Sequence, residues 1–158
     1  MTQVHEWGPH IWKLLHYHAE YAGASVLLAD EIRAWMAVLK TTEGVLACAT
    51  CREHYRTWRQ HHPTEEFIGK DKETFRELLR RWLWDLHESV NQDKGVPPER
   101  RIPFDELKRY REIPRYEIIQ SMSTLKDIFQ TAILHRQLNP MIVKEWLRTF
   151  TFLQKLIG

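Results

Sequence analysis

The chain is organised around the stretch Ala47-Cys48-Ala49-Thr50-Cys51-Arg52-Glu53-His54, which contains its only two cysteines. This C-x-x-C lies at the predicted start of a helix. Free backbone N–H groups and the helix dipole stabilise a thiolate at such a place, so the position suits a redox disulfide. Arg52 beside Cys51 adds positive charge that acts in the same direction. A disulfide across so short a loop adds little stability, which favours redox chemistry over a structural role.

Two other interpretations of the cysteine pair stay open. In a cytosolic chain a lone C-x-x-C is more often catalytic or metal-binding than a structural cross-link. Zinc could be bound by both cysteines with His54 and either His61 or His62. That spacing fits poorly, because structural zinc sites pair C-x₂₋₄-C with H-x₃₋₅-H and the histidines here are farther apart. The cysteines could also be two buried thiols that pack as small hydrophobic side chains.

The composition is that of a water-soluble globular protein. Its length of 158 residues corresponds to one domain, or to one domain with an appendage. The residues are 43% hydrophobic and 28% charged, which is ordinary for a globular protein. A net charge of +2, with interspersed charges, gives no signature of nucleic-acid or membrane binding. No apolar run approaches the ~20 residues of a membrane helix, and the N-terminus lacks a signal peptide. We therefore expect a cytoplasmic protein.

Apolar residues recur at helical spacing and predict an all-α fold. The expected helices are one that starts at Pro9 and ends before 23–25, one over 28–39 that ends near 41–44, one over 48–61, and one along 75–90 that ends at 95–98. A polar loop is expected over 62–71. Four helices with short connections favour an antiparallel bundle.

Further helices are expected after Pro98. They cover 104–112, 116–137 and 140–157, and the last two carry wide apolar stripes. Such stripes must be buried against the bundle or against another chain.

Polar and aromatic stripes on two of the helices form a candidate cofactor site. An all-helical protein with a redox dithiol needs an electron acceptor beside it, because two cysteines alone can only exchange disulfides. The stripes could hold a planar group, although a polar stripe is often only a solvated face. They consist of Trp12, His16, Trp84, His87, Asn91 and Lys94.

Three motifs follow one another along the chain: Gly8-Pro9-His10-Ile11-Trp12-Lys13-Leu14-Leu15-His16, Cys48-Ala49-Thr50-Cys51 and Leu86-His87-Glu88-Ser89-Val90-Asn91. Over about residues 6–112 they resemble the G-x-x-x-W-x-x-L-H, C-x-x-C and H-N-x-V-N motifs of the Erv/ALR family of FAD-linked sulfhydryl oxidases. The C-x-x-C-x-x-H pattern is most similar to compact members encoded by large DNA viruses. Glu88 stands where the family has asparagine, and Val96 where it has lysine.

The resemblance implies a four-helix bundle around FAD with a short fifth helix in residues 1–112, and a helical extension of unknown role in 113–158. Cys51 would face the flavin, and Cys48 would be attacked by substrate. The implied FAD-binding residues are Gly8, Trp12, His16, His87, Val90, Asn91, Lys94 and Tyr110.

The implied activity is that of an FAD-dependent thiol oxidase without a metal site. It would form disulfides in partner proteins, such as a small redoxin, and pass the electrons to O₂ to give H₂O₂. The resemblance also implies a homodimer that pairs through the first two helices, in the host cytoplasm or the virion for a viral member. The alternative is a non-enzymatic helical interaction module whose cysteine pair is structural or binds zinc.

Overall fold

A computed structural model describes all residues 1–158 and confirms the all-α prediction, since it contains helices and no strands. The α-helices are α1 (Val4–Glu20), α2 (Leu28–Thr42), α3 (Ala49–His61), α4 (Lys72–Asp93), α5 (Arg115–Leu134) and α6 (Pro140–Ile157). The short 3-10 helices are η1 (Glu43–Val45), η2 (Thr64–Phe67), η3 (Pro98–Arg100) and η4 (Phe104–Glu112). None of the helices has the length and apolar character needed to cross a membrane.

Local capping interactions explain several of the helix ends. The carboxylate of Asp71 accepts the N–H of Thr74 at 2.8 Å and so caps the start of α4. Gly95, at φ +68°, terminates the same helix in the left-handed conformation that glycine adopts without strain. Asn139 caps α6 through the N–H of Met141 at 2.8 Å. These boundaries agree with the sequence-based prediction because their signals are local.

Two expectations about local structure were wrong. The first helix starts at Val4 rather than at Pro9, which lies inside α1. Pro9 cannot donate to the carbonyl of His5, but His5 is exposed and water can replace the missing bond. The polar loop over 62–71 contains η2 and the fully buried Phe67. The short helix expected over 104–112 is present as the 3-10 helix η4.

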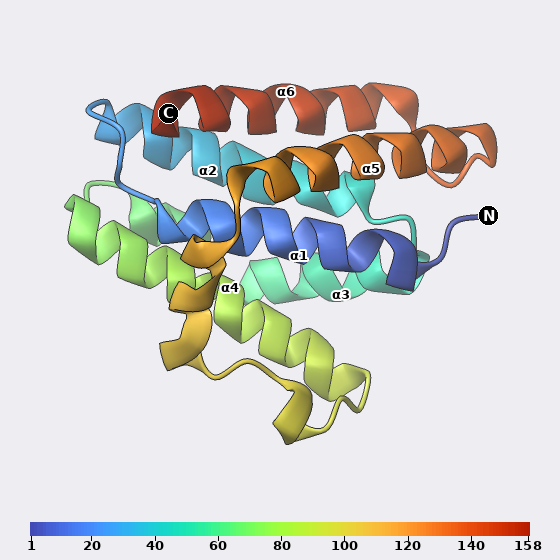
Figure 1. The fold of residues 1–158 in the computed structure, drawn as a ribbon, viewed down its shortest axis with the longest axis horizontal. Helices are drawn as coiled ribbons and strands as arrows, with labels where there is room; N and C mark the ends of the chain where they lie inside the picture. Colours follow the sequence, from blue (N-terminus) through green and yellow to red (C-terminus); the bar gives the residue numbers. More distant parts are fainter.

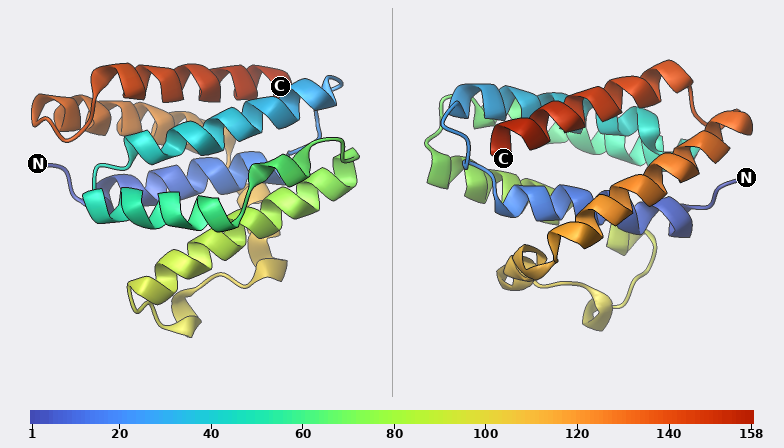
Figure 2. Two further views of the ribbon diagram at one scale, coloured as in Figure 1. Left: turned by 180° about the vertical axis from the view of Figure 1, so that it is seen from behind. Right: turned by 45° about the horizontal axis from the view of Figure 1, so that its top comes forward.

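The helices are arranged in layers (Figure 1). Helices α1 and α2 lie between α3 and α4 on one side and α5 and α6 on the other, and Figure 2 shows the same order from behind. α5 packs on α1, and α6 packs on α2. The apolar stripes of the C-terminal helices are thus buried against the first two helices of the same chain, in one hydrophobic core to which all six α-helices contribute.

Two contacts show how closely the C-terminal helices pack. Trp146 is fully buried, and its indole N–H donates to the hydroxyl of Thr42 at 3.1 Å. At Gly44, an added Cβ would overlap the side chain of Ile142, so glycine permits the close approach of α6 to η1. The division of the chain at residues 112 and 113 stays a prediction, but the two parts share a core.

A buried ion-pair network joins the segments that frame the candidate site. The carboxylate of Glu20, on α1, accepts from Arg80 of α4 at 2.7 Å and from Arg111 of η4 at 3.0 Å. Only 2% of the Glu20 side chain is exposed, so both guanidinium groups compensate a charge that burial would otherwise penalise. The network therefore fixes η4 against α1 and α4.

Candidate active site

Cys48 and Cys51 form a disulfide at the N-terminus of α3, with their Cα atoms 5.2 Å apart. Cys48 is the N-cap residue, and its Sγ accepts the backbone N–H of Cys51 at 3.2 Å. The hydroxyl of Thr50 lies 3.2 Å from the same sulfur. Donors directed at Cys48 can stabilise negative charge on this sulfur when the disulfide opens.

Arg52, which was expected to favour the thiolate, has a further role. Its guanidinium donates to the carbonyl of Leu46 at 2.6 Å and so braces the segment that leads into the cysteine pair. The position of Cys48 is therefore fixed by hydrogen bonds to the residues before it and after it in the chain.

An aromatic column lies between α1, α4 and η4. Trp12 of α1 stacks on His87 of α4, with ring centroids 3.9 Å apart and planes at 7°. His16 of α1 stacks on Tyr110 of η4 at 4.8 Å and 22°. A hydrogen bond of 3.0 Å between Nε2 of His16 and Nδ1 of His87 joins the two stacked pairs. Four residues separated by up to 98 positions in the sequence thus form one set of near-parallel rings.

The two histidines of the column are neutral. Burial lowers the pKa of His16 well below its usual value, and the nearby His87 lowers it further. Burial, with a smaller effect of the Lys94 charge, lowers the pKa of His87 to about 4. Because each ring is neutral, one nitrogen of the hydrogen-bonded pair donates and the other accepts. Burial also raises the pKa of the Tyr110 hydroxyl, so this ring is uncharged as well.

Acidification between pH 6.5 and 4 is expected to destabilise the fold. Unfolded histidine binds a proton near pH 6.5, whereas folded His87 and the buried His18 do so only near pH 4. The unfolded state then binds more protons within this window, so the free energy of unfolding falls with falling pH, by on the order of 2–3 kcal/mol for each histidine. Urea unfolding at pH 7, 5.5 and 4.5 measures the slope.

The variant His87→Phe keeps a ring against Trp12 and should reduce this pH slope, while the exposed His5→Asn serves as the control. A free energy of unfolding that is constant from pH 7 to 4.5 would contradict the neutral state of the buried histidines.

A small cavity opens beside the column, and several of its walls were missed from the sequence. The residues that line it are His16, Trp84, His87, Glu88, Asn91, Ile102, Leu107 and Tyr110. Ile102 and Leu107 come from the segment after α4, whose position is fixed by a hydrogen bond of 2.8 Å from the indole of Trp84 to the carbonyl of Ile102. The only sequence signal for this part of the cavity was the three-residue spacing of Phe104 and Leu107, which is typical of one face of a helix.

The other predicted cofactor residues lie at varied distances from the column. Gly8 is buried in α1, one turn before Trp12, and an added Cβ there would meet only Val4 at 3.6 Å. Val90 is half-buried and packs against the core. Lys94 is exposed at the C-cap of α4. Their roles in cofactor binding stay predictions.

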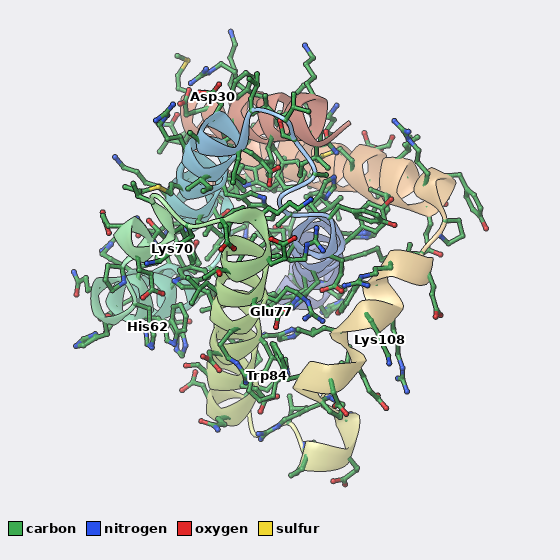
Figure 3. All side chains as sticks on the ribbon, turned by 90° about the vertical axis from the view of Figure 1, so that its left-hand side faces the viewer. Asp30, His62, Lys70, Glu77, Trp84 and Lys108 are labelled. Carbon is green, nitrogen blue, oxygen red and sulfur yellow. A yellow bond between two sulfur atoms is a disulfide. The ribbon has the colours of Figure 1, made fainter.

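A second side of α4 faces α3. Figure 3 shows α4 between α3, whose C-cap is His62, and η4, which carries Lys108. His54 of α3 forms a hydrogen bond with Ser89 of α4, with 3.0 Å between Nε2 and Oγ. His54 lies one turn after Cys51, and Ser89 lies within one turn of His87, so this bond holds the start of α3 near the part of α4 that carries the column.

The donor set beside the column fits a planar nucleotide cofactor such as FAD. Near-parallel rings offer stacking faces, and the amide of Asn91, which lines the cavity, can donate and accept hydrogen bonds. The carboxylate of Glu88 would repel a phosphate, but Arg101 pairs with it at 3.3 Å. Lys94 lies near enough to affect the pKa of His87 and provides a cation at the end of α4. A ring that enters between Trp12 and His87 must separate them.

The fold and the site together define a class: helical proteins with a disulfide at a helix N-terminus and a column of stacked aromatic rings. The profile of the Erv1 / Alr family matches residues 9–111, which is more than half of the chain. The chain belongs to the Erv1 / Alr family. Membership implies FAD-linked sulfhydryl oxidase activity at the level of the family. Comparisons with curated proteins and with solved structures find no match.

Proposed function

We propose that this chain is an FAD-dependent thiol oxidase that forms disulfides in partner proteins through Cys48 and Cys51 and uses O₂ as the final acceptor. The observation that carries the proposal is the disulfide at the N-terminus of α3, in a chain that belongs to a family of sulfhydryl oxidases. The aromatic column and the small cavity beside it support the proposal, because they offer ring faces and polar groups that a planar cofactor could contact once the stacked rings separate.

The chemistry at the cysteines is thiol–disulfide exchange. A substrate thiolate attacks Sγ of Cys48, the Cys48–Cys51 bond breaks, and Cys51 leaves as a thiolate. The second thiolate of the substrate then attacks the mixed disulfide and releases Cys48. The substrate has lost two electrons and two protons and holds a disulfide, and the cysteine pair holds both electrons. The N–H of Cys51 and the hydroxyl of Thr50 stabilise Cys48 as it leaves.

The other predicted site residues would hold the cofactor. Gly8, Trp12 and His16 would contact the flavin from α1. His87, Val90 and Asn91 would hold the adenosine, with Lys94 near a phosphate and Tyr110 as a stacking face from η4. A bound flavin would supply a two-electron acceptor that O₂ can reoxidise, and the net reaction would convert two thiols and O₂ to a disulfide and H₂O₂.

The rival interpretation, a zinc-binding or structural module, has less support. No group of three or more His, Cys, Asp or Glu side chains is arranged to hold a metal ion. Both sulfurs are already joined to each other. Stoichiometric zinc in the purified protein, together with a lack of flavin binding, would favour that rival.

Two finer parts of the sequence-based expectation stay predictions. One is the likeness to viral members, with a location in the host cytoplasm or the virion. The other is the homodimer paired through the first two helices. Because α5 and α6 of the same chain cover α1 and α2, a homodimer of this chain would need a different surface.

Flavin binding tests the proposal directly. The purified protein, reconstituted with FAD, should show bound-flavin absorbance and consume O₂ with dithiothreitol. Tyr110→Ala removes one stacking face and should weaken flavin binding by about tenfold, whereas the exposed Tyr116→Ala should not change it. A folded protein that takes up no flavin under these conditions would refute the proposal.

A further inference from the structure

A polar groove of about 460 Å³ lies between α3 and α4, on the side of α4 that faces away from the aromatic column. Ser89 and Asp93 of α4 form one wall of the groove. The other, longer wall runs along α3 from Thr50 to His62, the C-cap of this helix. None of these residues belongs to the predicted cofactor set. The groove therefore provides a surface that cofactor binding leaves unexplained.

One end of the groove reaches the reactive disulfide. Thr50 lines the groove and also places its hydroxyl 3.2 Å from Sγ of Cys48, the sulfur that we expect a substrate to attack. A thiol that lies at this end of the groove is next to Cys48. The other end has an aromatic wall, where Trp58 stacks on His62 with ring centroids 3.7 Å apart and planes at 10°.

The charges of the groove are unbalanced. It is lined by two carboxylates, Glu53 and Asp93, and by no lysine or arginine, although the chain as a whole is slightly basic. Both side chains are exposed, and neither forms an ion pair within the chain. Elsewhere Glu43 and Glu88, for example, are paired with arginines. Arg56 lies close enough to Glu53 for that charge to help raise the arginine pKa, but its ion pair is with Glu43, so both groove carboxylates can accept an external cation.

We propose that the α3–α4 groove docks the thiol-bearing segment of a protein substrate, and that this segment carries lysine or arginine beside its cysteine. The inference rests on the proposed function, because it takes Cys48 as the sulfur that the substrate attacks. Glu53 lies about one helical turn from Thr50, which places the expected cation one or two residues from the reacting cysteine.

The length of the groove sets the length of the segment. Residues 50–62 of α3 extend over about 18 Å at 1.5 Å per residue. An extended peptide covers this distance with about five residues at ~3.3 Å each. The substrate is therefore recognised through a short extended segment, and a small dithiol such as dithiothreitol does not use the groove.

Charge reversal in the groove separates docking from chemistry. Oxygen consumption by the flavin-loaded protein is measured at pH 8, above the usual histidine pKa, with dithiothreitol and with two dithiol pentapeptides whose cysteines are flanked by lysine or by aspartate. In the variant Glu53→Lys/Asp93→Lys, kcat/KM should fall five- to tenfold for the lysine peptide and rise for the aspartate peptide. The rate with dithiothreitol should stay within about twofold.

The matched control is Glu66→Lys/Asp127→Lys, which makes the same change of charge at two exposed acids outside the groove. The docking proposal would be overturned if the two double variants changed kcat/KM equally, or if either peptide responded to the groove variant as the other did. Oxidation of dithiothreitol would still support the oxidase activity in that case. If the wild-type protein oxidised no dithiol, the proposed function would fail. Docking would then be decided by fluorescence anisotropy of a labelled lysine peptide with serine in place of cysteine. Weaker binding to the groove variant alone would support it, and unchanged binding would not.

Discussion

The variant Cys51→Ala is expected to lose dithiol-dependent oxygen consumption by at least about 10³-fold. With one sulfur removed, no Cys48–Cys51 disulfide can form, and the remaining Cys48 thiol gives a substrate thiolate no disulfide bond to attack. Flavin binding should be retained, because the aromatic column is built from α1, α4 and η4. The measurements are oxygen uptake with dithiothreitol and the absorbance of bound flavin.

The stability of this variant should change little. The lost cross-link closes a loop with a sequence separation of three, for which the chain-entropy contribution is small. Ser123→Ala, at an exposed position of α5, controls for a small substitution remote from the site. An oxidation rate that survived in Cys51→Ala would show that electrons leave the substrate by a route without this sulfur.

The variant Trp146→Ala is expected to lower the free energy of unfolding by about 3–5 kcal/mol. Trp146 is fully buried on α6, with Phe129 at 5.7 Å and Phe150 at 5.0 Å between ring centroids. Its removal would leave a cavity at the contact of α6 with α2 and would also abolish the bond to Thr42. Urea unfolding monitored by circular dichroism gives the value.

A second substitution on the same helix provides the control for Trp146→Ala. Phe152 is 52% exposed, so Phe152→Ala should cost less than about 1 kcal/mol. If the two variants were equally stable, α6 would contribute little to the core, and residues 113–158 would be an appendage rather than a part of the folded unit.

The helices could be predicted because their signals are local. The apolar period along α4 and the glycine that follows it determine where this helix lies and where it ends. The start of α1 was predicted wrongly because proline is common in the first turn of a helix. Pro9 lies at a hydrated position inside the helix, and the sequence alone does not distinguish the two cases. The burial of Phe67 was not predicted, because two adjacent apolar residues, Phe67 and Ile68, in a polar segment form no periodic pattern.

The candidate site was predictable only in part. Trp12 with His16, and His87 with Asn91, stand out because each pair lies four residues apart on one helix face. Their meeting with Tyr110 depends on the path of the chain after α4. The ion pair of Glu88 with Arg101 depends on the same path, so neither could be read from local spacing.

The N-cap role of Cys48 has a consequence for turnover. The backbone N–H of Cys51 bonds to Sγ of Cys48 while the sulfurs are joined, and a Cys48 thiolate can accept the same bond after they separate. Helix α3 then keeps its first turn in both oxidation states. In the proposed reaction, the cysteine pair can therefore open and close without unwinding the first turn of this helix.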